Sequence, residues 1–156
     1  MRIVTLLLPV VFLLTSCTKK KDPVSVDKLV FGAFYGMCPQ NCVHIYQVDA
    51  TTVQKDDSVK HPDGDWTYNF NGTTTLSNDK FSVAKGLLSQ VPAELLSANN
   101  KTYGAPDSHD QGGMYILIEK GTEKRRFRID FDNSSDQSTE LIAFKNKVAD
   151  VINKLN

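Results

Sequence analysis

Two cysteines and a histidine lie close together near the start of the chain, and their side chains are well suited to chemistry. Cys38 and Cys42 are separated by the turn-forming residues Pro-Gln-Asn, and His44 follows two residues later. Thiolate and imidazole groups bind soft and borderline metal ions, and a pair of thiols can also cycle between reduced and oxidised forms. The same two cysteines can form a structural disulfide. A metal site, a redox site and a disulfide are therefore all open, and the compartment of the protein decides between them.

The first 17 residues, MRIVTLLLPVVFLLTSC, have the features of an export signal. Arg2 supplies a positive start, and residues 3–14 form an apolar run that is too short to span a bilayer. The tetrad Leu14–Cys17, LTSC, resembles the lipobox of bacterial lipoproteins. That resemblance implies removal of residues 1–16 as a signal peptide, attachment of diacylglyceryl to the Cys17 thiol and acylation of its amine. Several acyl chains on one residue anchor a protein stably in a lipid bilayer.

The rest of the chain divides into a short tether and one domain. Residues 17–27 are interpreted as the lipidated cysteine and a polar tether, and residues 28–156 as a single domain of sufficient length to bury a core. Thr18 follows the cysteine, where an aspartate would resemble the inner-membrane retention signal of some bacterial lipoproteins. We therefore expect a lipid-anchored protein of the bacterial cell envelope, with the outer membrane favoured.

Export bears directly on the two remaining cysteines. It places Cys38 and Cys42 in an oxidising compartment, and lipidation of Cys17 leaves them as the two free thiols among three cysteines. A turn of this length can bring two α-carbons within about 7 Å, so the sequence favours a Cys38–Cys42 disulfide. The alternative is a small periplasmic copper-binding or redox protein. The pattern C-P-x-x-C resembles the site of Sco-type copper-delivery proteins, which implies copper held by both cysteines and a histidine. In that family the histidine is distant in sequence; here His44 shares strand parity with Cys42, so a site of Cys38, Cys42 and His44 is sterically conceivable.

A long polar loop, residues 104–113, is the second candidate site. Asp107, His109 and Asp110 are potential ligands for a hard or borderline cation, and binding residues are common in loops on a rigid sheet. The alternative is structural, because Pro-Asp initiates turns and Gly-Gly permits a bulge before a strand. The segment PDSHDQGG resembles loops of uncharacterised small bacterial lipoproteins, which implies no particular activity.

Catalytic and nucleotide-binding signatures do not occur in the sequence. It contains no G-x-S-x-G, P-loop, dinucleotide fingerprint or H-E-x-x-H pattern. Without Arg2, 17 basic residues stand against 18 acidic ones, which gives no reason to expect nucleic acid. A local basic cluster, Lys124 to Arg126 with Arg128, is interpreted as the solvated face of a strand, with an anionic partner as the alternative. We predict a protein that is not an enzyme and has no cofactor.

Hydrophobic patterning predicts strands and helices that do not alternate. Strands are expected at residues 29–35, 43–48, 51–54, 66–70, 114–118 and 124–132. A helix is expected within residues 78–96, broken at Pro92, and a longer amphipathic helix at residues 141–155. Gly121 lies in the hairpin turn between the last two strands. The predicted core combines strand and helix residues: Ile116, Ile118, Phe127, Ile129, Phe131, Leu141, Phe144, Val148, Val151 and Ile152.

This order of elements indicates an α+β fold. We expect an antiparallel sheet of about five strands, with helices on one face and a long C-terminal helix. With a lipid anchor and no catalytic signature, the predicted function is a membrane-anchored, non-enzymatic binding or interaction module of the cell envelope. Its partners would be the lipid bilayer, through Cys17, and an envelope protein or ligand that the sequence does not name.

Overall fold

The structure is a computed structural model, and it describes residues 25–38, 40–58, 61–62 and 66–156. The predicted signal peptide, Cys17 and most of the predicted tether lie outside these residues. Within the described part, no helix is both long enough and apolar enough to cross a membrane.

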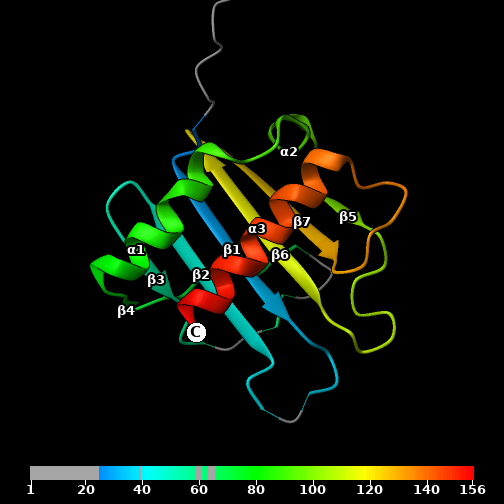
Figure 1. Cartoon of the computed structure of the whole chain (residues 1–156), viewed down its shortest axis with the longest axis horizontal. Helices are drawn as coiled ribbons and strands as arrows, with labels where there is room; N and C mark the ends of the chain where they lie inside the picture. Colours follow the sequence, from blue (N-terminus) through cyan, green and yellow to red (C-terminus); the bar gives the residue numbers. More distant parts are fainter. Residues whose placement is uncertain (1–24, 39, 59–60, 63–65) are drawn as a thin grey trace, which may run out of the picture.

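The centre of the molecule is a seven-stranded sheet (Figure 1). The strands are β1 (Lys28–Phe34), β2 (Val43–Asp49), β3 (Val53–Lys55), β4 (Thr74–Thr75), β5 (Lys101–Tyr103), β6 (Gly113–Lys120) and β7 (Glu123–Asp130). Their spatial order is β4-β3-β2-β1-β6-β7-β5, and every pair is antiparallel except β5 with β7, which is parallel. Our prediction of an α+β fold is confirmed. The prediction of about five strands, all antiparallel, is wrong, because the sheet is mixed and has seven strands.

The two strands that were not predicted are the short edge strands. β4 consists of two exposed threonines, and β5 buries only Tyr103. Such short strands bury too few side chains to show hydrophobic alternation. They are recognised as strands only by their hydrogen bonds to the neighbouring strand. The predicted hairpin is confirmed: β6 and β7 pair from Gly113–Asp130 to Lys120–Glu123, and Gly121 in the turn has φ of 57°, which a glycine adopts without strain.

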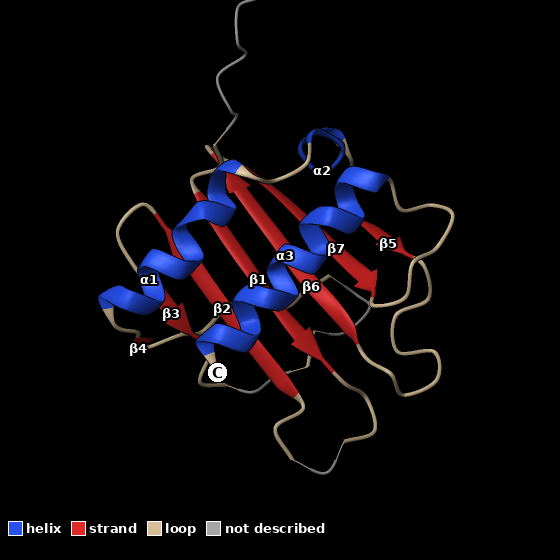
Figure 2. Cartoon of the chain, viewed as in Figure 1, coloured by secondary structure: helices blue, strands red, loops and turns tan. Residues whose placement is uncertain are grey.

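Three α-helices and a 3₁₀ helix cover one face of the sheet (Figure 2). They are α1 (Asn78–Ala84), the 3₁₀ helix η1 (Lys85–Ser89), α2 (Ala93–Ser97) and α3 (Thr139–Leu155). Pro92 occupies the N-cap position immediately before α2, close to the predicted break. Ser138 caps α3, because its Oγ accepts a hydrogen bond of 3.1 Å from the Leu141 amide.

The main core lies between these helices and the sheet. It contains nine of the ten residues predicted for the core, and the tenth, Phe131, is half-buried and packs against it. The contributing strand residues alternate, as Leu29, Phe31 and Ala33 do in β1, because successive side chains point to opposite faces. Within the described part of the chain, this core runs from Val26 to Leu155 and joins β1 to the last turn of α3.

The opposite face of the sheet carries a smaller apolar cluster: Val30, Phe34, Val43, Ile45, Tyr68, Tyr115 and Leu117. Tyr68 comes from the segment predicted as a strand at residues 66–70, and that prediction is wrong. Within that range the chain forms no strand, and Trp66 has a φ of 67°. Instead, the Tyr68 ring packs edge-on against Tyr115, with centroids 5.1 Å apart. Alternation of aromatic and polar residues indicates that one side of the segment is buried. A loop that lies on a sheet produces this pattern as well as a strand does.

Asp56 holds the segment around Tyr68 in place on the sheet. Its carboxylate accepts hydrogen bonds from the Ser58 amide at 2.7 Å, the Ser58 hydroxyl at 2.6 Å, the Asn71 amide at 3.3 Å and the Tyr68 hydroxyl. Burial by itself would raise the pKa of Asp56, but these hydrogen bonds together outweigh burial, and the pKa lies below its ordinary value. The charged carboxylate therefore stabilises the fold.

Candidate functional site

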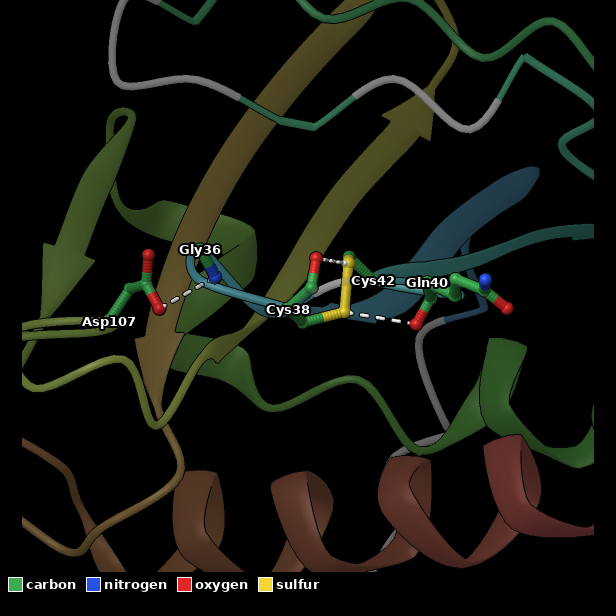
Figure 3. Close-up of a disulfide and its surroundings, with 5 residues drawn as sticks. All are labelled: Gly36, Cys38, Gln40, Cys42 and Asp107. Carbon is green, nitrogen blue, oxygen red and sulfur yellow. Dashed lines mark hydrogen bonds between the residues drawn. A yellow bond between two sulfur atoms is a disulfide. The ribbon is translucent and has the colours of Figure 1, made fainter.

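The two candidate sites of the sequence meet at one end of the molecule. Gly36, in the loop after β1, donates its amide hydrogen to Asp107 Oδ1 at 2.9 Å, although 71 positions separate them (Figure 3). The same oxygen accepts the Gly112 amide at 3.1 Å, and the Asp107 amide donates to the Gly112 carbonyl oxygen at 2.8 Å. Asp107 thereby closes its own loop and joins it to the loop that contains the cysteines. We call residues 35–38, 40–42 and 104–112 together the loop end.

Cys38 and Cys42 form a disulfide within the loop end, with α-carbons 5.5 Å apart (Figure 3). This fits the predicted cross-link, and Asn41 makes the turn possible by adopting a φ of 55°, which asparagine tolerates better than most residues. Met37 lies beside the disulfide and is 80% exposed. A large apolar side chain held on a cross-linked loop is available to a partner at little cost in conformational entropy.

The three predicted ligands in the second loop differ in their surroundings. Asp107 is half-buried, and its carboxylate is engaged by the two backbone amides described above. His109 and Asp110 are exposed, and His109 Nδ1 lies 3.0 Å from the Ser108 hydroxyl. The structure thus gives Asp107 a turn-stabilising role. Binding by His109 and Asp110 stays a prediction.

His44 does not lie on the same side of the sheet as Cys42. Cys42 precedes β2 and packs against the smaller cluster, which includes Ile45. His44 points to the helix-covered face, where it lines a cavity of about 160 Å³ together with Tyr35 and the last turns of α3. Among the described residues, no three histidine, cysteine, aspartate or glutamate side chains are grouped so that they could hold a metal ion. Although Cys42 and His44 share sequence parity, Cys42 lies before β2 and the two side chains face opposite sides of the sheet, so the copper alternative gains no support from this geometry.

A third segment, residues 130–137, contacts the loop end through the carboxylates of Asp130 and Asp136. Asp130 Oδ2 accepts the Ala105 amide at 2.9 Å, and Asp136 accepts the Gly104 amide at 3.1 Å. Lys145 of α3 holds this segment, since its ammonium group contacts the carbonyl oxygens of residues 130, 131 and 132 at 2.9 to 3.0 Å. Sequence reasoning missed this role. The available signal was a lysine within the apolar stripe of a helix, which is 2% exposed in the structure.

The loop end lies opposite the point at which the described chain begins. β1 starts near the β6–β7 turn, where the Asp27 amide donates to the Glu119 carbonyl oxygen at 3.0 Å and the Gly121 amide donates to Asp27 Oδ2 at 2.6 Å. β1 then crosses the sheet and ends at Phe34, just before the disulfide loop (Figure 1). β1 has seven residues of extended chain, so it spans about 23 Å from the start of the described domain to the loop end.

Comparison with known proteins found no matching family model, no matching curated protein and no matching solved structure. A functional argument for this chain therefore rests on its sequence and its geometry.

Proposed function

We propose that the protein is a membrane-anchored, non-enzymatic binding or interaction module of the bacterial cell envelope. In this proposal acyl chains on Cys17 hold it in a bilayer, with the outer membrane favoured. The observation that supports it best is the placement of the loop end. An anchor before residue 25 enters the domain at one end of β1, and the cross-linked loop with exposed Met37 lies at the other end. The loop end would thus face away from the membrane, where a partner could reach it.

The anchor is tested by Cys17→Ser in the full-length protein. The original chain should incorporate labelled palmitate and sediment with membranes, because the Cys17 thiol is the acceptor of the lipid. Cys17→Ser should do neither. Cys38→Ser is the matched control, since it removes a cysteine that is not expected to be lipidated. A Cys17→Ser protein that still carries palmitate and stays in the membrane fraction would refute the anchor.

The loop end is tested by photo-crosslinking in intact cells. A photoreactive amino acid placed at Met37 should give discrete adducts with one envelope component. The control is the same amino acid at Val83, an exposed large apolar residue on α1, which is 37% exposed. Adducts that form equally at both positions, or at neither, would mean that the loop end is not the binding surface. This outcome is independent of palmitate labelling, so the two parts of the proposal can fail separately.

A further inference from the structure

Two arginines of β7 lie on the sheet face that carries no helix. Arg126 pairs with Leu117 and Arg128 with Tyr115 across β6, and both partners belong to the smaller apolar cluster. Each arginine is half-buried, and each has a buried Nε that has no hydrogen-bond partner among the described residues. We call Arg126 and Arg128 the arginine strip.

Neighbouring basic residues of the same strand are neutralised, whereas the arginine strip is not. Lys124 Nζ lies 2.9 Å from Glu119, and Arg125 lies 2.7 Å from Glu123. Neither Arg126 nor Arg128 forms an ion pair with another residue in the described part of the chain. The acidic side chains near the start of β7 are thus already engaged by other cations.

An aromatic ring orients one of these guanidinium groups, and polar residues of the neighbouring strand border both. Arg128 lies over the ring of Phe34, 5.1 Å from its centroid, and such stacking restricts its orientation. β5 borders the strip, with Thr102 paired to Arg128 and Asn100 Oδ1 accepting the Arg126 amide at 2.9 Å. Thr102 and Asn100 are exposed, and their hydroxyl and amide groups can donate beside the strip. Residues two apart on a strand are about 6.6 Å apart, so both arginines can reach one ligand.

We propose that the arginine strip binds a phosphate-bearing ligand. A half-buried guanidinium with an unsatisfied N–H is costly without an anion, and its planar fork matches the oxygens of phosphate or carboxylate. One guanidinium suffices for the two oxygens of a carboxylate. Two guanidinium groups with a hydroxyl and an amide beside them match the larger number of oxygens and the higher charge of a phosphate group. The phosphate can belong to a lipid headgroup or to a soluble molecule. The strip is separate from the loop end, and the proposal holds whatever the loop end binds.

The test uses a chain that begins at Thr18, which is the proposed mature protein without the lipidated Cys17. Calorimetry should detect pyrophosphate binding, and the double variant Arg126→Gln with Arg128→Gln should weaken it at least about tenfold through loss of charged hydrogen bonds. The matched control is Arg125→Gln, which removes one arginine of the same strand that is already ion-paired. Nitrogen-15 spectra should show the Nε–H signals of Arg126 and Arg128 shifting as pyrophosphate is added.

Two further measurements keep the proposal refutable. If the glutamine double variant does not fold, Arg126→Lys with Arg128→Lys retains the charge and the apolar stems but loses the planar forks, and should still bind several-fold more weakly. Succinate should bind more weakly than pyrophosphate. Equal weakening by Arg125→Gln, equal binding of succinate, or no binding that depends on the strip would each overturn the proposal.

Vesicle flotation separates the two sources of phosphate. Vesicles of phosphatidylcholine with about one third phosphatidylglycerol are compared with vesicles of phosphatidylcholine alone, at an ionic strength near 0.15 M so that long-range attraction is screened. Flotation with the anionic vesicles that is lost in the glutamine double variant supports a lipid headgroup. Pyrophosphate binding that depends on the strip, without such flotation, supports a soluble phosphate.

Discussion

Replacing Lys145 by methionine should destabilise the protein, because this lysine holds the segment that supports the loop end. Its ammonium group contacts five oxygen atoms: the carbonyl oxygens of Asp130, Phe131 and Asp132 at 2.9 to 3.0 Å, Asn133 Oδ1 at 3.1 Å and Gln137 Oε1 at 2.7 Å. Methionine has a similar length and can occupy the same buried position, but it donates no hydrogen bond. The substitution therefore removes the hydrogen bonds and largely preserves the packing.

The size of the effect follows from where the acceptors lie. The bonds to the Asp130 carbonyl oxygen and to Gln137 Oε1 are buried, and a buried acceptor left without a partner costs about 1–3 kcal/mol. The Asp130 carbonyl oxygen keeps a longer bond of 3.5 Å from Gln137 Nε2, so its loss lies at the low end of this range. The other three bonds are only partly buried, so water can replace them at a small cost. Methionine recovers part of this loss because it removes the desolvation of a buried charge. That desolvation lowers the pKa of Lys145, although Asp130 and Asp132 oppose it. We expect a net loss of about 2–4 kcal/mol.

The assay is urea denaturation followed by circular dichroism, combined with hydrogen exchange of the backbone amides in residues 131–137. Lys145→Met should lower the denaturation midpoint and reduce the protection of this segment. Lys147→Met is the control, since Lys147 is exposed on the same helix and its replacement should change stability by less than about 0.5 kcal/mol. A Lys145→Met protein as stable as the control, with unchanged protection, would show that the ammonium group does not organise the segment.

Three further predictions concern other parts of the fold. Asp56→Asn should cost about 1–3 kcal/mol at pH 7. Because the pKa of Asp56 is lowered by folding, its stabilisation is complete above the unfolded value of about 3.9 and is lost as the pH falls through the folded value. Thermal melts of both proteins should therefore converge at low pH, and a difference that persists or grows there would contradict this linkage. Phe144→Ala should cost about 3–5 kcal/mol in urea denaturation, since the ring is 4% exposed, and an unchanged midpoint would mean that α3 does not pack on the sheet. Reduction of the Cys38–Cys42 disulfide should cost about 2 kcal/mol by loop entropy, and non-reduced peptides should be two mass units lighter than reduced ones. Free thiols with stoichiometric Cu(I) uptake, lost in Cys38→Ser, would instead favour the copper alternative.

Much of the fold follows from hydrophobic periodicity. The long strands β1, β2, β6 and β7 and the helix α3 each bury several side chains, and burial at a regular spacing leaves a pattern that a single sequence shows. The α+β class, the hairpin at Gly121 and the residues of the main core were predicted for that reason. The cysteine pair was likewise predictable, because three intervening residues keep the two α-carbons within disulfide reach in many turn conformations.

Other features depend on contacts between distant segments, and no local pattern encodes them. The parallel pairing of β5 with β7 follows from where the chain returns after α2, and the two threonines of β4 form a strand only because β3 lies beside them. Alternation at residues 66–70 fits a strand and an overlying loop equally well, and packing against Tyr115 decides between them. The sequence singled out Asp107 as a possible cation ligand and the basic residues of β7 as a solvated face or an anion site, and it gave Lys145 no role. The tertiary structure gives them different roles, because a hydrogen bond or an unpaired charge depends on which groups the fold brings within about 3 Å of each other.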